Sequence, residues 1–568
     1  MATVLRTIFV AAPMIVGTAV IFALTITSLH IIRRLFSNAS LPGSLPWVGE
    51  GKYGNRLGRV KGNLTSALHL TKLLDEGYVK RSDQQSLPSN QYSKNDQTYV
   101  LPYFINGPQV VLPPSQIPWL MEQGEDVLSQ EHVNRQFLEA DYTFFHANMV
   151  EGSVHPEIIQ HQLTKKMNGF ADDIVDEVRA CLEDYWGTDT EEWHEVRVYD
   201  TLLLVITRMS IRVFMGLPFC RDETFLSICS NFIRKVALAA AAISLFPEFL
   251  KPDPEKEALT CENCRIVGPI FTIFDYILYR RCSRFIMPVI QERLNRLRKP
   301  DTDKPPLEDP IVHNDYVQWA IDHALARPVV NPVELDPRLI AARFAVLAFA
   351  AIQSSVITLT NAIFDLAASP TCAESLASMR EEVLREAGTE DEPATAEGQP
   401  AWSKTVLSRM THVDSALRES LRINGFIERG IMKMVVAPEG VTIPDGSHIP
   451  CGTKVGVSGY SIHHDEANYT DAMRYDAFRF ARGQGGVEGG KKMPQGLINT
   501  SEKFMSFSHG SHACPGRFFA TNQLKIALGH IALLYDIEPI PERPANKWLF
   551  GHIAPPLTET LRVRRRKM

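Results

Sequence analysis

The stretch F-S-H-G-S-H-A-C-P-G, residues 507–516, decides the fold of this chain, and its chemistry centres on Cys514. Gly510 and Gly516 permit backbone angles that other residues rarely adopt, so the chain can turn tightly and offer N–H groups to the sulfur. Residues 517–534 have helical periodicity, and the N-terminus of that helix would lie beside the cysteine and favour its thiolate. The pattern predicts a thiolate that ligates a metal; a buried, inert cysteine is the alternative interpretation.

Two further motifs precede this loop. Glu419 and Arg422 form E-x-x-R in a predicted helix that begins near Val413, and the i, i+3 spacing places both side chains on one face, where they can pair. The segment Y-D-A-F-R-F follows at residues 475–480 and brings Arg479, a planar donor suited to a carboxylate. Each motif alone is weak evidence for any particular site, because it also occurs by chance. Their order and spacing before the cysteine loop form a much more specific pattern.

This ordered set resembles the haem-binding sequences of the cytochrome P450 family, because the loop matches F-x-x-G-x-H-x-C-x-G. The resemblance implies a mainly α fold with small β-sheets, and a haem whose iron takes Cys514 as its axial thiolate ligand. It further implies that His512 bonds a haem propionate and that Phe507, Gly510 and Gly516 shape the loop.

The same resemblance assigns a structural task to the upstream motifs. Glu419, Arg422 and Arg479 would form a buried network beneath the haem and lock the scaffold. Loss of one partner would leave a buried charge uncompensated, at a cost of roughly 3–5 kcal/mol.

Residues 338–368 are expected to form the longest helix, and it is apolar nearly all round, as in a helix that crosses the centre of a large domain. In the family this helix passes over the haem with A-G-x-[DE]-T-[TS] and relays protons to bound oxygen. Here Ala351 stands for the glycine, Gln353 for the acid and Ser354 for the threonine. Glutamine orients water but does not titrate, whereas serine keeps a hydroxyl for a water-assisted relay and can bond the i−4 carbonyl.

Other cofactor and metal contacts are less defined by the sequence. The family often contacts a propionate through W-x-x-x-R on an early helix, and we find no such motif on an early predicted helix of this chain. The segment 155–166 is the nearest candidate for that contact. Arg429 and Lys433 could make a second propionate contact or be an exposed basic pair. Cys261 and Cys264 form C-x-x-C, but no second pair or suitably spaced histidines follow to complete a zinc site.

The chain has 568 residues, 22% of them charged, and a formal net charge of −6, which gives no support to a nucleic-acid partner. Its nine cysteines are scattered, as in a protein of a reducing compartment. No linker divides the body, so we expect an N-terminal membrane anchor at residues 1–36, a proline-rich hinge at 37–50 and one catalytic domain at 51–568.

Residues 8–32 carry no formal charge and are long enough to span a bilayer as a single transmembrane helix. Arg33 and Arg34 follow directly and only Arg6 precedes, so the positive-inside rule places the body in the cytosol. The resemblance to microsomal members implies the endoplasmic reticulum membrane. A buried core helix is the other interpretation of this segment.

The loop H-A-C-P-G-R-F-F-A and the segment F-M-G-L-P-F-C at residues 214–220 resemble those of fungal family members from secondary metabolism. The resemblance implies a membrane-anchored haem-thiolate monooxygenase that oxidises a lipophilic metabolite, such as a terpenoid or polyketide. Electrons would come from a separate NADPH-cytochrome P450 reductase, because the chain shows no dinucleotide or flavin fingerprint. The strongly apolar segments at 232–250 and 271–290 lie in the region that, by the same resemblance, forms a lid over the substrate, and ordinary helix packing is the alternative. The alternatives are rearrangement, dehydration or ring formation without net oxygen insertion, a non-catalytic haem-binding protein, and a structural membrane protein.

Overall fold

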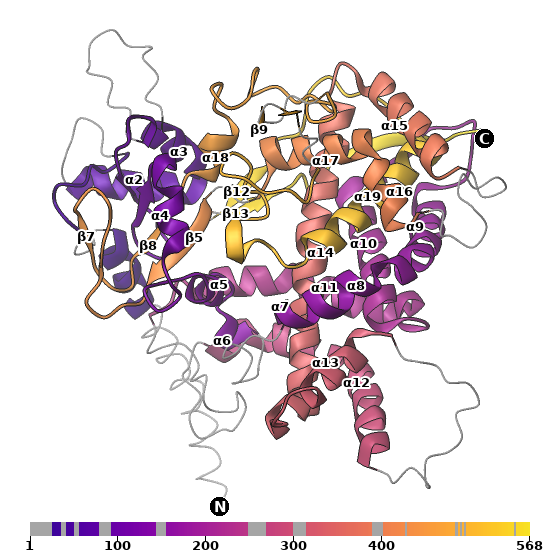
Figure 1. The fold of residues 1–568 in the computed structure, drawn as a ribbon, viewed down its shortest axis with the longest axis horizontal. Helices are drawn as coiled ribbons and strands as arrows, with labels where there is room; N and C mark the ends of the chain where they lie inside the picture. The colour runs from indigo at the N-terminus through magenta and orange to yellow at the C-terminus, as the bar shows by residue number, and fades with distance from the viewer. Residues whose placement is uncertain are drawn as a thin grey trace, which may run out of the picture. The chain divides into compact units, whose positions relative to one another are not determined.

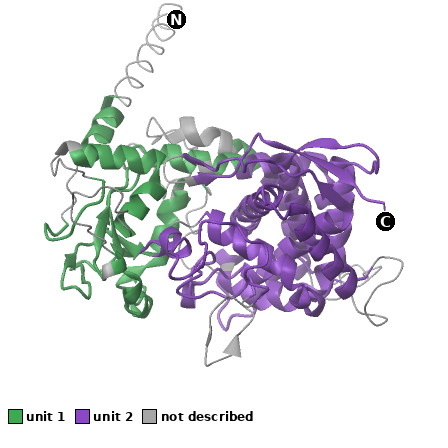
Figure 2. Ribbon diagram, turned by 90° about the horizontal axis from the view of Figure 1, so that it is seen from above, with its two compact units in different colours: residues 1–152, 234–281, 432–456 green, residues 153–233, 282–431, 457–568 purple. Residues whose placement is uncertain are grey.

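The structure is a computed structural model that describes residues 25–35, 41–49, 56–78, 93–143, 155–247, 268–298, 314–388, 402–426, 429–482, 487–488, 491–492, 496–549 and 552–567. The chain divides into two compact units (Figure 2). Unit 1 comprises residues 1–152, 234–281 and 432–456, and unit 2 comprises residues 153–233, 282–431 and 457–568. Residues 8–24 of the predicted transmembrane helix 8–32 lie outside the described residues, so the division into anchor, hinge and catalytic domain stays a prediction.

Helices dominate the described residues (Figure 1). They are helix 25–35, α2 Arg56–Leu68, α3 Leu70–Tyr78, α4 Ile117–Glu122, α5 Gln130–Leu138, α6 Ala140–Thr143, α7 His155–Ile158, α8 Thr164–Lys166, α9 Ala171–Trp186, α10 Val198–Met215, α11 Glu223–Ile243, α12 Gly268–Arg298, α13 Tyr316–Leu325, α14 Pro337–Ala367, α15 Cys372–Glu386, α16 Lys404–Arg409, α17 Thr411–Asn424, α18 Gly459–His463 and α19 Arg517–Leu534. The short turns are the π-turn η5 Ile159–Leu163 and the 3₁₀ turns η2 Ser93–Asn95, η3 Pro114–Gln116, η6 Met167–Phe170, η7 Phe219–Arg221, η10 Pro332–Leu335 and η11 Gly510–His512.

The strands form small sheets. They are β1 Tyr99–Leu101, β2 Gln109–Leu112, β3 Leu128–Ser129, β4 His194–Arg197, β5 Gly430–Val435, β6 Val441–Thr442, β7 His448–Ile449, β8 Lys454–Val457, β9 Val487–Glu488, β10 Lys491–Lys492, β11 Tyr535–Ile537, β12 Lys547–Leu549, β13 His552–Ala554 and β14 Thr560–Arg565. One sheet has the order β1-β2-β8-β5-β3, a second has β11-β14-β4, and β6–β7, β9–β10 and β12–β13 are two-stranded pairs. The prediction of a mainly α fold with small sheets is confirmed.

α14 lies at the core of unit 2, packed against α10 and α17 (Figure 1). Its start follows from its sequence: the Asp336 carboxylate accepts a hydrogen bond from the Arg338 N–H at 2.8 Å, and Pro337 occupies the first turn. The observed bounds, 337–367, agree with the predicted helix. α14 was predicted to be the longest helix, and α12 equals it, since each has 31 residues.

α17 and α19 match the other predicted helices of unit 2. α17 begins at Thr411, and the Glu382 carboxylate of α15 accepts hydrogen bonds from the N–H groups of His412, at 2.8 Å, and Val413, at 3.0 Å. A carboxylate at this end satisfies donors that have no partner within the helix and favours the helix dipole. α19 begins at Arg517, directly after the cysteine loop.

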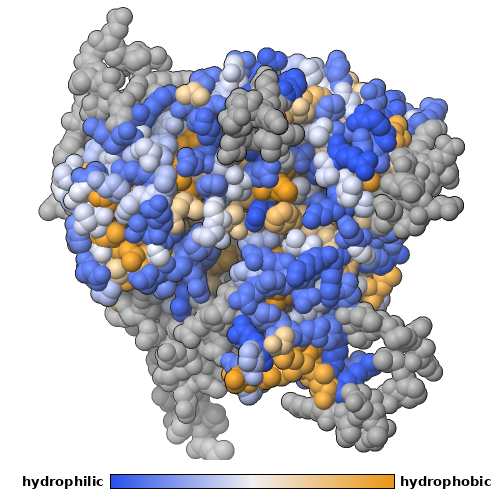
Figure 3. All heavy atoms as spheres, in the orientation of Figure 1, coloured by the Kyte–Doolittle hydropathy of each residue, from blue (hydrophilic) through white to orange (hydrophobic). Residues whose placement is uncertain are grey.

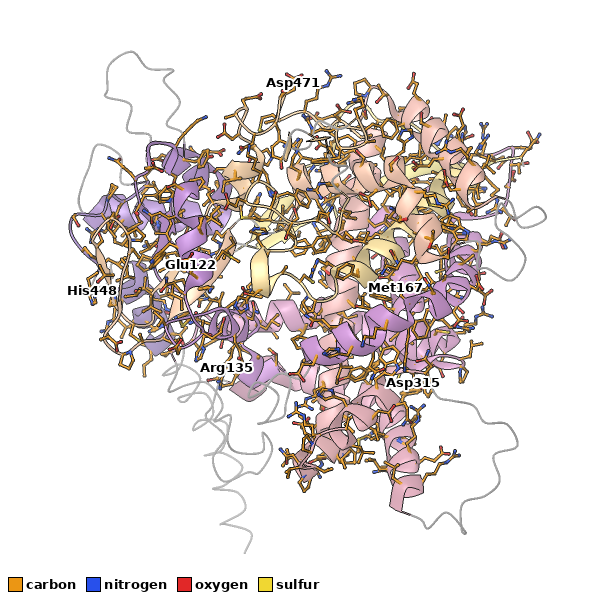
Figure 4. The ribbon with its side chains drawn as sticks, viewed as in Figure 1. Glu122, Arg135, Met167, Asp315, His448 and Asp471 are labelled. Carbon is orange, nitrogen blue, oxygen red and sulfur yellow. The ribbon has the colours of Figure 1, made fainter. Side chains whose placement is uncertain are left out.

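α12 and α13 are joined within unit 2 by a buried carboxylate. Asp315, labelled in Figure 4, caps α13 by accepting from the Gln318 N–H at 3.1 Å. The same carboxylate binds the Arg293 guanidinium of α12, with Nη2 2.6 Å from Oδ2. A bidentate pair of this kind fixes both helices in one geometry.

Two helices of the described residues, α11 and α14, are long and apolar enough to cross a bilayer. α14 is largely buried, as expected of a core helix. Figure 3 shows a mainly hydrophilic face with an apolar area where Figure 1 places α13. Leu325 at the end of α13 and Val329 and Val330 just beyond it are exposed.

Candidate functional site

The cysteine loop is a tight turn held by its own backbone. The Cys514 N–H donates to the Phe507 carbonyl at 2.8 Å, and the Ala513 N–H donates to the Gly510 carbonyl at 3.1 Å. Gly510 has φ of +72°, a left-handed conformation that favours glycine, and Ser508 has φ of +60°. The half-buried Phe507 thus contributes its carbonyl to the turn that presents Cys514.

The sulfur of Cys514 lies at the N-terminus of α19. Burial raises the pKa of its thiol, while the backbone N–H groups of Gly516 and Arg517 and the charge of Arg517 oppose that rise. Gly516 has φ of −83°, and a Cβ there would lie 3.9 Å from the sulfur, an ordinary van der Waals distance. The expectation that this position needs the conformational freedom of glycine was therefore wrong. A bound metal cation would add its positive charge to these groups and keep the Cys514 side chain as the thiolate. An axial ligand of this kind must be a thiolate.

The other described cysteines lack these features. Cys451 is exposed, and the remaining five, Cys181, Cys220, Cys229, Cys282 and Cys372, are buried. Burial raises the pKa of Cys181 to about 12 and that of Cys372 to about 11. Cys261 and Cys264 lie outside the described residues. No group of three or more metal-binding side chains occurs in the part of the chain that the structure describes.

Glu419, Arg422 and Arg479 meet as a buried cluster. Arg422 donates to both carboxylate oxygens of Glu419, with Nη2 2.7 Å from Oε1 and Nε 2.8 Å from Oε2, and the Arg479 Nε lies 2.9 Å from Oε1. Arg422 also donates to the carbonyls of His463 and Ala472, at 2.6 and 2.7 Å. These partners compensate the charges inside the protein. The predicted contact between the two motifs is present.

Hydrogen bonds join α17, which carries Glu419 and Arg422, and the neighbouring α18 to the segment that leads into the cysteine loop. Ser506 donates to the Leu421 carbonyl at 3.0 Å, and the Met505 N–H donates to His463 Nε2 at 3.0 Å. Burial holds the pKa of His463 well below its usual value, so the imidazole is neutral and Nε2 can accept. The hydrogen bond from Met505 gives this histidine a structural role between α18 and the segment before the cysteine loop.

Arg418 is a structural residue of this region that the sequence did not single out. Its guanidinium lies 3.8 Å from the ring centroid of Phe504 and 4.7 Å from that of Phe480, and it donates to the Asn499 carbonyl at 2.9 Å. Burial lowers its pKa to about 10. In the sequence, Arg418 is marked only by its position next to Glu419. An arginine on an exposed face of the same helix would give the same pattern.

α14 has one accessible stripe in an otherwise buried stretch. Between Leu339 and Ala367 the accessible residues are Val346, Ala350, Ala351, Gln353 and Ser354. Ala350, Gln353 and Ser354 follow Val346 by four, seven and eight residues, a helical spacing that places these four on one face. The centre of the helix therefore presents an alanine and two polar side chains to one side.

The two polar side chains of this stripe differ. The Ser354 hydroxyl donates to the Ala350 carbonyl at 2.8 Å, which confirms the expected i−4 bond, and Thr358 donates to the Ser354 carbonyl at 2.8 Å. The Gln353 Oε1 is buried and has no hydrogen-bond partner in the described structure, and neither has the Ser355 hydroxyl. Local helix bonds thus account for Ser354 but not for Gln353. No described hydrogen bond joins either residue of the stripe to Cys514.

The remaining predicted contacts are placed as follows. Segment 155–166 forms α7, the π-turn η5 and α8, and its His161 and Lys165 are exposed. Lys433 is buried and donates to the Gln123 carbonyl at 2.9 Å, so its interpretation as half of an exposed basic pair was wrong. Burial lowers its pKa. His512 is half-buried in η11, directly before the Ala513–Cys514 turn.

Comparison with known proteins identifies the class. The cytochrome P450 family model matches residues 154–557, which include the cysteine loop, the Glu–Arg–Arg cluster and α14. The chain is 35% identical over 407 residues to cytochrome P450 monooxygenase 151 of Postia placenta, covering 71% of this chain and 73% of that protein. It is 31% identical over 540 residues to cytochrome P450 monooxygenase polB of Polytolypa hystricis, covering 93% and 94%.

A third relative, cytochrome P450 monooxygenase gloP of Glarea lozoyensis, is 30% identical over 84% of this chain and 85% of its own length. This chain belongs to the cytochrome P450 family. It is a P450 oxidoreductase with a small-molecule substrate and a redox partner, and its cofactor is a haem whose iron is ligated by a cysteine thiolate.

Proposed function

We propose that this protein is a monooxygenase that inserts one atom of O₂ into a lipophilic secondary metabolite and reduces the other atom to water. The observation that carries the proposal is the Cys514 sulfur, presented on a left-handed turn with backbone donors from Gly516 and Arg517. Bound haem would supply oxygen activation, and the thiolate would donate electron density to the iron. The fungal relatives named monooxygenases support the same reaction class.

Each predicted site residue has a part in this proposal. Cys514 holds the iron, His512 bonds a propionate, Phe507 and Gly510 set the turn, and Gly516 begins α19 beside the sulfur. Glu419, Arg422 and Arg479 hold the scaffold, because their charges are mutually satisfied inside the protein.

The accessible stripe of α14 would serve oxygen and water. Ser354 keeps a hydroxyl whose proton is shared with the Ala350 carbonyl, so it can exchange that bond for one to a water molecule. The unpaired Gln353 Oε1 can accept a hydrogen bond from the same water and so orient it. Both side chains are neutral. Proton delivery at this stripe would therefore depend on bound water and not on a carboxylic acid side chain of α14.

We further propose that residues 8–32 form a single transmembrane helix in the endoplasmic reticulum membrane, with the catalytic body in the cytosol. Arg33 and Arg34 after the apolar run favour this orientation. NADPH-cytochrome P450 reductase in the same membrane would then deliver the electrons.

The test is to remove the gene from the producing fungus and compare metabolites by mass spectrometry. A precursor that accumulates and lacks one or more oxygens identifies the substrate. Its conversion by the purified protein with reductase and isotopically labelled O₂ should place one labelled atom in each product molecule per cycle. A product of the same mass as the precursor would instead establish rearrangement.

A further inference from the structure

Arg34 joins helix 25–35 to two distant parts of unit 1. Its Nη1 donates to the Ser244 carbonyl at 2.7 Å and to the Ile105 carbonyl, which are 210 and 71 positions away in the sequence. The next residue, Leu35, accepts a hydrogen bond at its carbonyl from Asn63 Nδ2 of α2 at 3.3 Å. The last turn of the helix is thus held by three polar contacts from three segments.

The chain beyond residues 36–40 is held as well. Val100 of β1 donates its N–H to the Pro46 carbonyl at 2.8 Å and accepts from the Val48 N–H at 3.1 Å. Leu45 and Val48 are buried, and the Arg59 guanidinium lies 4.8 Å from the ring centroid of Trp47. Residues 45–48 therefore extend the sheet of unit 1, and the described ends on both sides of 36–40 are docked on that unit.

The Ser244 contact links Arg34 to the end of α11. Ser244 follows directly after Ile243, the last residue of α11, and its own hydroxyl donates to the Ala241 carbonyl at 2.8 Å. The Arg34 contact therefore reaches the C-terminal end of α11, within the apolar stretch 232–250. Figure 2 shows helix 25–35 running outward from the edge of unit 1.

We propose that Arg34 is a positioning residue that makes the end of the membrane anchor a folded part of unit 1 and couples it to the end of α11. This inference rests on the proposed anchor at residues 8–32. The anchor and unit 1 then move as one body, and the bilayer holds the end of α11 at a constant depth. A guanidinium suits this task because its separate N–H groups reach carbonyls from different segments.

Arg33 provides a matched control. It is the neighbouring residue, carries the same charge and is exposed. Replacing either arginine by alanine removes one positive charge after the anchor, so both variants change the orientation signal equally. Only Arg34→Ala also removes the contacts to Ile105 and Ser244.

The experiment is hydrogen–deuterium exchange with mass spectrometry on the full chain in lipid nanodiscs. Arg34→Ala should speed exchange by about tenfold or more in peptides covering 25–35 and 241–247, the loss expected for charge-assisted hydrogen bonds, while Arg33→Ala matches the wild type. Equal exchange in the two variants overturns the proposal. If Arg34→Ala does not accumulate with bound haem, Asn63→Ala should still speed exchange in 25–35, and unchanged exchange there overturns it.

Failure of the anchor itself is measured separately. Alkaline carbonate extraction of membranes from wild-type cells should leave the protein in the membrane. Release by carbonate contradicts the anchor, whereas retention together with equal exchange in Arg33→Ala and Arg34→Ala contradicts only the role of Arg34.

Discussion

Arg479 binds Glu419 across 60 positions of sequence, with Nε 2.9 Å from Oε1, and both side chains are buried. Glu419 already pairs with Arg422 on its own helix, so the second arginine joins α17 to the segment that follows α18. The cluster converts two short sequence motifs into one tertiary contact.

Arg479→Met should therefore lower the free energy of unfolding by about 3–5 kcal/mol, because the variant breaks a buried ionic cluster by removing one partner. We expect little protein with bound haem and a lower unfolding temperature. The control is Arg482→Met, which removes a half-exposed arginine paired with Asp476 and should cost about 1 kcal/mol or less. If the two variants lose the same free energy of unfolding, the buried cluster stabilises the fold no more than a surface ion pair does.

Cys514→Ala should abolish the thiolate-type shift in the absorption of the reduced CO complex, because no sulfur would remain to ligate the iron. Cys451→Ala removes an exposed cysteine and should leave that spectrum unchanged. A thiolate-type spectrum in the Cys514→Ala protein contradicts the ligand assignment.

Ser354→Ala should increase the hydrogen peroxide released per NADPH consumed by several-fold, because a hydroxyl that can orient water is lost from the accessible stripe of α14. Ser354→Thr retains the hydroxyl and should stay near the wild-type value. The neighbouring Ser355→Ala is the control, since Ser355 is buried and lies off the stripe. The measurement is the ratio of peroxide to oxidised NADPH with reductase and a bound substrate.

His530 predicts a loss of stability in acid. It is buried against Trp402, with ring centroids 4.2 Å apart, and burial lowers its pKa from 6.5 to about 4. Between these values the unfolded chain binds a proton here and the folded protein does not. Stability therefore falls as the pH drops from about 6.5 to about 4, by up to about 1.4 kcal/mol per pH unit.

The check is urea unfolding at several pH values across this window. His530→Phe keeps an aromatic ring against Trp402 and should show a shallower decline than the wild type. His448→Gln, which replaces an exposed histidine, should decline as the wild type does. Identical slopes for His530→Phe and the wild type would exclude this contribution.

Local patterns determined much of this protein. Helical periodicity placed α14, α17 and α19, because apolar spacing acts within a few positions of the chain. The glycine, histidine and cysteine spacing of the loop around Cys514 and the E-x-x-R motif of Glu419 identified the family. Both are short-range signals that survive in a single sequence.

Other features depended on long-range packing. The sequence did not reveal that Lys433 is buried, that Arg418 lies against Phe504, or that Arg34 reaches Ser244. Nor did it separate Ser354, whose hydroxyl is satisfied by its own helix, from Gln353, whose Oε1 is not.

The physical reason for this division is distance along the chain. Periodicity and motif spacing are properties of neighbouring residues, so the sequence by itself determined helices α14, α17 and α19, the family and the identity of the cysteine loop. The environment of a charged or polar side chain depends on segments that can lie hundreds of positions away, as for Lys433, whose partner Gln123 is 310 positions distant. Only the tertiary structure decided which charges are paired, which polar atoms lack partners and which face of α14 is accessible.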